Sequence, residues 1–455
     1  ALNNSFIVDD LLADNLQTLG GNVYFTKCSG ILPACINTKF DYVYKDNIFD
    51  RIRNFNKWKL SKKACNRCNV KTASMKPSYN IINLDDIDAS DNMSSFLDNN
   101  LNNCTNGENI FYRGVDIKEH AFSGTVRFFA NGNPFNEVQY ENIFKNYFAS
   151  AVLSTELAYY IFAKYSIDVI CAHHGIYVPQ GPFVDVAKIL NKRIITWNIG
   201  GQKKRLFFCD KDTYHKEFPK RKVKNYNISC KNKDKVQNYL LSRETGVNDW
   251  LKFHTADRGV IKPIEDIRQN NSDVKIISMF TNVFWDAQLH FKENLFDNML
   301  DWIIKTIHHI KDKENTYLIV REHPGEFKGQ QVSRYMVSNF LLSNNLLSDK
   351  IILIKSKDAV NSYQLAEESD FSLVYGSKMT HELSARGVKV IVAGDAWAKN
   401  KGFTIDPVSE NEYYNAIDEC LKISGLKPKQ IRTVAIANII AHKIRIGDII
   451  ISALD

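Results

Sequence analysis

The chain has 455 residues, of which 44% are hydrophobic and 24% are charged. This composition is that of a globular protein and excludes disorder of the whole chain, and the length predicts two or three domains. Apolar runs reach only strand length, far short of the roughly 18 residues that a membrane-spanning helix needs.

The formal net charge is +8, and many of the basic residues lie in 192–236. A basic surface attracts nucleic acid, phospholipid head groups or an anionic glycan, although a solvated face is the simpler explanation. The sequence has no zinc-finger, RNP or helix-turn-helix pattern, so nucleic acid is not expected as a partner. Possible peripheral membrane association is the better of the functional interpretations.

Nine cysteines, an odd number, and the lack of an export signal predict reduced thiols and a cytoplasmic location, with the inner face of the membrane as the alternative to the bulk cytoplasm. Cys65 and Cys68 form a CxxC motif. Together with Cys28 and Cys35 they could complete a four-thiolate zinc site. The wide spacing of the upstream pair favours the alternative, unligated thiols.

The N-terminal half begins with a predicted helix and strand, then becomes irregular. Residues 77–108, rich in Asn, Asp and Ser, are expected to be a loop or insertion. Alternating helices and strands follow at 139–165, 168–172, 181–190, 193–197 and 206–209. Residues 1–262 are therefore predicted to form a Rossmann-like domain, and this is the domain expected to bind the acceptor substrate of a transfer reaction.

The C-terminal half has a clearer pattern, in which short β-branched runs alternate with amphipathic segments. Strands are expected at 274–280, 317–321, 350–355, 371–375 and 389–393, and helices at 286–310, 332–345, 362–369 and 379–386. Gly387 is expected to end the last of these helices, because glycine accepts the left-handed conformation. These elements predict a second Rossmann-like domain at 263–426, after a linker at 257–273 and before a helical tail at 427–455 that packs back.

The predicted fold class is α/β, with two Rossmann-like domains facing a central cleft. Ligands in such folds bind at the carboxyl ends of the strands. Gly376, Ser377, Lys378 and Thr380 follow the strand at 371–375 and lead directly into a helix. Backbone N–H groups, two hydroxyls and a lysine suit a phosphate or diphosphate. The alternative is an ordinary helix cap with nothing bound.

Other strand ends add polar residues to the same rim. His323 can donate to a phosphate oxygen, and Pro324 fixes the turn that aims it. If the bound phosphate belongs to a nucleotide, Glu382 could accept hydrogen bonds from the ribose hydroxyls, and Lys401 could bring a positive charge close to the nucleotide. Asn282 follows the first strand of this half. His323, Glu382 and Lys401 each have a structural alternative, which is respectively a backbone-bonded histidine, a glutamate that complements the helix dipole, and a polar surface turn.

The N-terminal half offers candidates for a general base. His173 and His174 follow the strand at 168–172, where they could take the proton of an acceptor hydroxyl. Asp116 and Glu119 lie in an earlier loop with a histidine and could act as the base or hold the acceptor. A solvated turn is the alternative for that loop.

Four segments resemble bacterial capsule and surface-polysaccharide biosynthesis proteins, which are glycosyltransferases of the GT-B type. They are HHGIYVPQG, TNVFWDA, REHPGE and VYGSKMTHELSARGVKVIVAGDAWAKNKGFTIDP, within about 111–218 and 274–407. The His-Pro dipeptide followed by a Gly-Ser loop is also similar to the donor half of Kdo and sialic acid transferases. By that resemblance His323, Ser377 and Thr380 hold the donor phosphate and Glu382 contacts ribose. The acidic motif that supplies the base in those transferases is not clearly matched.

The leading hypothesis is a glycosyltransferase that moves a sugar from a nucleotide sugar to a glycan or glycolipid acceptor of the capsule or lipopolysaccharide type. No metal or other cofactor is expected to be required. The alternatives are a polyol-phosphate transferase of the teichoic-acid type, a UDP-sugar 2-epimerase, and a binding protein that has lost its activity.

Overall fold

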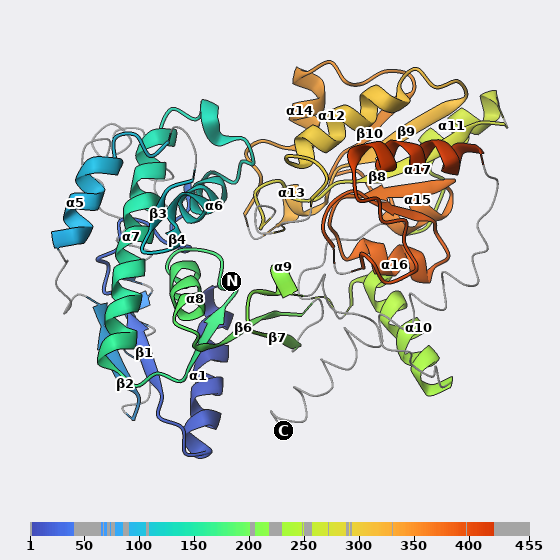
Figure 1. Cartoon of the computed structure of the whole chain (residues 1–455). Helices are drawn as coiled ribbons and strands as arrows, with labels where there is room; N and C mark the ends of the chain where they lie inside the picture. Colours follow the sequence, from blue (N-terminus) through green and yellow to red (C-terminus); the bar gives the residue numbers. More distant parts are fainter. Residues whose placement is uncertain are drawn as a thin grey trace. The chain divides into compact units, whose positions relative to one another are not determined.

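The computed structural model describes residues 2–422 apart from 41–64, 67, 71–72, 74–77, 85–90, 106–108, 201–204, 218–229, 248, 250–256, 272, 288–290, 292–293, 330 and 397. The chain divides into two compact units (Figure 1). The N-terminal unit comprises Ala1–Trp197 and Cys209–Thr213, and the C-terminal unit comprises Asn198–Phe208 and Tyr214–Asp455.

The N-terminal unit contains helices of very different lengths and three small sheets. Its helices are α1 (Leu2–Thr18), α5 (Asp91–Asn100), α6 (Ile117–Phe129), the short 3-10 helix η3 (Pro134–Asn136), α7 (Tyr140–Lys164) and α8 (Gln180–Ile189). Its strands are β1 (Tyr24–Lys27), β2 (Asn80–Asn83), β3 (Phe111–Tyr112), β4 (Val115–Asp116), β5 (Val169–His173), β6 (Arg193–Ile199) and β7 (Leu206–Asp210), the last two of which extend across the division between the units.

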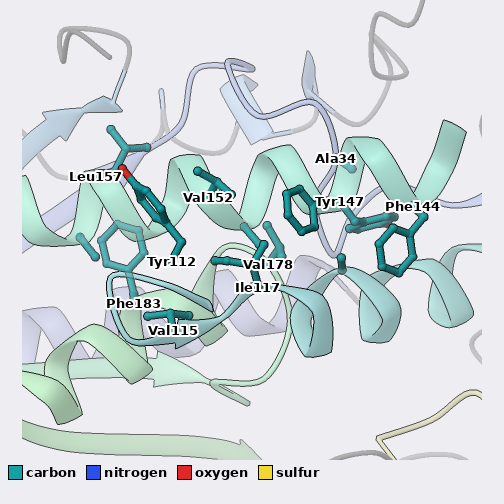
Figure 2. Packing of buried hydrophobic residues seen from close by; sticks show 14 of the residues in the cluster. Ala34, Tyr112, Val115, Ile117, Phe144, Tyr147, Val152, Leu157, Val178 and Phe183 are labelled. Atoms are coloured by element: carbon teal, nitrogen blue, oxygen red, sulfur yellow. The ribbon is translucent and has the colours of Figure 1, made fainter. Parts of the chain in front are cut away.

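Aromatic and aliphatic side chains from α6, α7 and α8 form the core of this unit, and Figure 2 shows part of it around Tyr147 and Val178. Helices α6 and α7 approach closely because Gly124 has no side chain: a Cβ there would lie 2.2 Å from the Tyr147 ring. The core holds the start of α6 against the β5–α8 loop, which carries the predicted base residues.

Strands β5 and β6 are parallel, with Val169 opposite Arg193 and His173 opposite Trp197. The third strand of this sheet, β7, returns antiparallel to β6: Lys211 N donates to Ile194 O, and Gly200 N donates to Arg205 O. The carboxyl ends of β5 and β6 therefore lie at one edge of the sheet.

The C-terminal unit is built on a five-stranded parallel sheet in the order β10-β9-β8-β11-β12. Its strands are β8 (Lys275–Phe280), β9 (Thr316–Arg321), β10 (Ile351–Ile354), β11 (Phe371–Val374) and β12 (Val390–Val392). Its helices are α9 (Tyr214–Glu217), α10 (Cys230–Thr245), α11 (Lys262–Asn270), α12 (Met299–Ile310), α13 (Gly325–Lys328), α14 (Val337–Ser343), α15 (Ser362–Glu367), α16 (Met379–Ala385) and α17 (Glu410–Lys422).

Both faces of this sheet are buried, because alternate strand residues enter two different cores. Ile277 and Met279 pack in the core that includes α12, α14 and α17, whereas Ile276 and Phe280 pack in the core that includes α11, α15 and α16. The strand order is that of a doubly wound Rossmann sheet, in which the chain changes direction between its first and fourth strands. Here these strands are β8 and β11.

The α/β class and the positions of the predicted strands are confirmed. The helix predicted at 286–310 starts only at Met299, because the Asn298 side chain accepts from Leu300 N and Asp301 N and caps the helix there. Residues 77–108, predicted as loop, contain β2 and α5, and Phe96 of α5 packs 4.6 Å from the Tyr112 ring. Gly387 has φ +89, as expected of the residue that ends α16.

The division between the units falls near residues 197–214, whereas the sequence placed a boundary at 262. Helix α10 lies in the C-terminal unit, where Arg386 donates to the carbonyl of Leu240 at 3.0 Å. The predicted linker at 257–273 contains α11, which buries Ile264 and Ile267. The predicted tail at 427–455 and much of the basic stretch at 192–236 lie outside the described residues.

Candidate functional site

The carboxyl ends of β8 and β11 define the most informative site in the C-terminal unit. The two strands are hydrogen-bonded neighbours, and Phe280 lies opposite Val374. The chain leaves β8 and β11 toward opposite edges of the sheet, which separates the two loops that follow and creates the usual ligand position of such folds. Asn282 and Gly376, both predicted as site residues, follow these strands.

The structure joins Asn282 and Gly376 directly. The side-chain amide Nδ2 of Asn282 donates to the carbonyl of Gly376 at 2.8 Å. Gly376 cannot be replaced without movement, because a Cβ there would lie 2.8 Å from the carbonyl oxygen of Asp395. The loops after β8, β11 and β12 therefore meet at Gly376.

His323 follows β9, the next strand of the sheet, and has a defined tautomer. Its Nδ1 accepts from the backbone N–H of Gly325 at 2.9 Å, so the proton of the neutral ring is on Nε2. The backbone N–H of His323 donates to Thr281 Oγ1 at 3.2 Å, which ties this turn to the end of β8. His323 is half-buried, and its Nε2–H is a suitable donor to an anion. Pro324 is buried and precedes the short helix α13.

Ser377, Lys378 and Thr380 differ in what they contact. Ser377 is half-buried, and its Oγ accepts from Met379 N at 3.2 Å, the contact of a cap; an accepting hydroxyl still has its own proton to donate. Lys378 has exposed surface, but its ammonium group lies close enough to Arg243 and Glu382 to feel both charges, and burial lowers its pKa. The Thr380 hydroxyl is buried and donates to Ser377 O at 2.7 Å, so it fixes the turn instead of pointing to a ligand.

Glu382 is part of a buried network, and this placement does not suit the predicted ribose contact. Its Oε1 accepts from Tyr239 at 2.7 Å and from Arg243 Nε at 3.0 Å, and its Oε2 accepts from Tyr363 at 2.8 Å. Arg243 also pairs with the buried Asp249. Because its carboxylate already has three donors inside the protein, Glu382 is better described as an anchor between α10, α15 and α16.

Two buried lysines follow β12. Lys399 and Lys401 have little exposed surface, and Asp406 and Asp395 are the charges that influence Lys401. Burial lowers the pKa of Lys401 and outweighs the two carboxylates, which raise it. The predicted cation is therefore present in the loop after β12, although it is more enclosed than a surface turn.

Two buried glutamates beside His323 were not predicted. Glu322 accepts from Ser338 N at 2.7 Å and from Ser356 N at 2.8 Å. Glu326 accepts from Val337 N at 3.3 Å, and burial, with a smaller effect of Glu322, raises its pKa to about 9. The only sequence signal was the presence of both residues in the REHPGE segment. They hold the chain after β9, which carries His323, against α14 and the end of β10.

In the N-terminal unit, His173 and His174 lie together at the end of β5. Their rings are 4.1 Å apart, and the His173 ring lies 4.4 Å from Trp197 of β6. Trp197 Nε1 donates to Asp9 of α1 at 2.8 Å. Burial raises the pKa of Asp9 to about 7, against the lowering effect of this hydrogen bond. Sequence reasoning missed Asp9, which is distant in the chain from β5.

The loop with Asp116 and Glu119 is next to the β5–α8 loop, because His120 joins them. His120 Nδ1 lies 3.2 Å from Ile176 O, and Nε2 lies 2.7 Å from Asp185 Oδ2. Burial lowers the pKa of His120, but the Asp185 carboxylate outweighs it and the net shift is upward. With an acceptor at each nitrogen, His120 fixes the β5–α8 loop and is not a base.

Asp116 has a structural contact of its own. Its Oδ1 accepts from Glu119 N at 3.0 Å and caps α6. Glu119 lies in the first turn of the same helix and is half-buried. Of the four predicted catalytic residues, His173 and His174 therefore lie on a strand end, and Asp116 and Glu119 lie at a helix start.

Cys28, Cys35, Cys65 and Cys68, the residues considered for a zinc site, lie near one another. Burial is the main cause that raises the pKa values of Cys35 and Cys65. The neighbouring thiols of Cys28 and Cys68 raise both pKa values further. Among the described residues, no group of three or more His, Cys, Asp or Glu side chains is arranged to hold a metal ion.

No helix in the described part of the chain combines the length and the apolar character needed to cross a bilayer. The longest, α7, has buried polar side chains such as Ser150, Ser154 and Thr155.

No family model matches the sequence, and no curated protein matches it. A beta Kdo 2,4 transferase, KpsC of Thermosulfurimonas dismutans, is similar in structure at 13% identity, with 60% of this chain and 79% of that chain covered and a TM-score of 0.40. A putative UDP-N-acetylglucosamine 2-epimerase from Listeria monocytogenes has 12% identity, 66% and 78% coverage and a TM-score of 0.31. The N-terminal domain of trehalose-6-phosphate phosphatase from Candida albicans has 9% identity, 86% coverage of both chains and a TM-score of 0.36. All three TM-scores are below 0.5, so the fold rests on the sheet order and the function on this chain's own residues.

Proposed function

We propose that this chain is a glycosyltransferase that uses a nucleotide-activated sugar, with the nucleotide bound at the carboxyl ends of β8, β9 and β11. The observation that supports the proposal best is the joining of Asn282 to Gly376 between β8 and β11. His323 brings an Nε2–H from the neighbouring strand, and Ser377 brings a hydroxyl. Hydrogen-bond donors at this place can stabilise the charge that develops on a leaving nucleotide phosphate.

The proposed base is His174 or its neighbour His173. Each follows a strand of the N-terminal unit, and a histidine can accept the proton of an acceptor hydroxyl near neutral pH. Asp116 and Glu119 remain in the proposal as residues that hold the acceptor. The scheme requires no metal, because helix-turn donors and Lys401 can balance the phosphate charge.

The proposed acceptor is a glycan or glycolipid of the capsule or lipopolysaccharide type, and the protein is proposed to work at the cytoplasmic face of the membrane. The support for this is the sequence resemblance and the basic stretch at 192–236. Sedimentation with vesicles that contain anionic lipids tests the membrane association, which should weaken as salt screens the charges.

Thermal unfolding in the presence of CMP, CDP, UDP, GDP or dTDP tests the nucleotide site. A nucleotide at about 100 times its Kd should stabilise the protein by about 2.7 kcal/mol. His323→Ala and Ser377→Ala should each weaken that nucleotide about 5- to 150-fold, the equivalent of about 1–3 kcal/mol, whereas His308→Ala and Ser343→Ala, on exposed helical surface, are the matched controls.

Stabilisation by none of the five nucleotides, or equal affinities in the site and control variants, would contradict the proposed site. Turnover separates the reaction classes. Release of nucleotide with transfer to an acceptor supports glycosyl transfer, and conversion of the nucleotide sugar with no acceptor and no nucleotide release identifies an epimerase instead.

A further inference from the structure

The side-chain amide of Asn282 has only one sensible orientation. Its Nδ2 lies 2.8 Å from the carbonyl oxygen of Gly376. Exchanging the two amide atoms would place two oxygens, both acceptors, at that distance. The oxygen Oδ1 is therefore the atom directed away from Gly376.

Oδ1 accepts no hydrogen bond from any residue that the structure describes, and Asn282 is only 8% exposed. The backbone N–H of the same residue is directed at Met299 Sδ, at 3.1 Å. A buried acceptor without a donor is unfavourable and rare in native proteins. A donor supplied from outside the chain would remove this unfavourable state.

We infer that Asn282 Oδ1 accepts a hydrogen bond from a hydroxyl of the nucleotide sugar, on the ribose or on the transferred sugar. This inference rests on the proposed function. Ionised phosphate oxygens are acceptors, so they are poor partners for another acceptor oxygen, whereas a hydroxyl can donate to it. His323 Nε2–H and the Ser377 hydroxyl serve the phosphate, and Asn282 serves a hydroxyl.

Gly376 leaves space beside the Asn282 amide. Its missing Cβ would lie 2.8 Å from Asp395 O and 4.0 Å from Asn282 Nδ2. The glycine thus keeps side-chain atoms out of the space beside the Asn282 amide while its own carbonyl holds that amide in place. A site that reads a hydroxyl through a buried acceptor discriminates strongly against ligands that lack it.

Calorimetric titration of the wild-type protein and Asn282→Ala tests the inference. The probes are the ribonucleotide among CMP, CDP, UDP and GDP that stabilises the protein most, its 2′-deoxy and 3′-deoxy forms, and the matching nucleotide sugar. Asn270→Ala, on the exposed end of α11, is the control. If a ribose hydroxyl is the donor, its removal weakens wild-type binding about tenfold and has no further effect in Asn282→Ala.

If the donor is on the transferred sugar, Asn282→Ala weakens binding of the nucleotide sugar about tenfold more than it weakens binding of the free nucleotide. The deoxynucleotides test on the wild-type protein whether a ribose hydroxyl is the donor. Singly deoxygenated forms of the nucleotide sugar, also titrated into the wild type, test whether a hydroxyl of the transferred sugar is the donor. Neither test depends on the folding of a variant. Equal affinities for every hydroxyl-deleted ligand would overturn the inference and assign Oδ1 to an enclosed water. If no nucleotide binds to the wild type, the proposed function itself fails.

Discussion

The polar residues at the strand ends of the two units are of similar types, but they differ in their partners. In the C-terminal unit, His323 Nδ1 and Ser377 Oγ accept from backbone N–H groups, so the donor groups of these two side chains are Nε2–H and the hydroxyl O–H. In the N-terminal unit, His120 pairs with Asp185 and Asp116 caps α6. The comparison teaches that residue type at a strand end does not distinguish a ligand contact from an internal support, whereas the partner of each atom does.

Glu382 tests this distinction with the largest expected effect. Glu382→Ala leaves Arg243, Tyr239 and Tyr363 without their shared acceptor, and removing one partner of a buried ion pair typically costs about 3–5 kcal/mol. Urea unfolding measures the loss of free energy of unfolding. Glu419→Ala, at an exposed position of α17, is the control and should change little. Normal stability of Glu382→Ala together with weaker nucleotide binding would restore the predicted ribose contact.

Glu326 sharpens the comparison through pH. Burial, and then Glu322, raise its pKa from 4.5 to about 9. Between these two values the folded chain holds a proton that the unfolded chain has lost, so this group makes the free energy of unfolding fall as pH rises, by up to about 1.4 kcal/mol per pH unit. Below about pH 4.5 both states are protonated and the contribution is constant.

Glu326→Gln should remove this slope, because an amide does not titrate in this range. Urea unfolding at several values between pH 5 and pH 8.5 measures it. Glu265→Gln, in the exposed first turn of α11, is the matched control and should keep the wild-type slope. An unchanged slope in Glu326→Gln would show that the buried carboxyl is ionised in the folded protein.

Gly376 tests whether the loops after β8, β11 and β12 depend on one another. In Gly376→Ala the new Cβ would lie 2.8 Å from Asp395 O, so one loop must move, at a cost of about 1–3 kcal/mol. Nucleotide affinity should fall at the same time, because the movement displaces the Asn282 amide. Gly259→Ala has open space around the new Cβ and is the control. Unchanged stability and affinity in Gly376→Ala would show that the loops move independently.

The sequence predicted that Asn282, His323 and Gly376 follow neighbouring strands, because the carboxyl ends of parallel strands share one edge of a sheet. It could not predict that Glu382 is an anchor, because Tyr239 lies 143 residues away on α10, in a region without clear periodicity. The partner of His120 was missed for the same reason, since Asp185 is 65 residues distant. Local pattern identifies strand ends, whereas long-range contacts decide the role of each polar atom.

Asp116 offers the smallest and most selective test, because its two possible roles respond differently to one substitution. As the cap of α6 it accepts from Glu119 N at 3.0 Å. Asparagine caps a helix about as well as aspartate, whereas alanine costs about 1 kcal/mol. We expect Asp116→Asn to keep both the free energy of unfolding and kcat, and Asp116→Ala to lose stability and, because Asp116 is proposed to hold the acceptor, to raise the KM for the acceptor. A large fall of kcat in Asp116→Asn, with stability intact, would instead make this carboxylate the base. The comparison between the units would then change, because a residue supported within its own helix would also act on the acceptor.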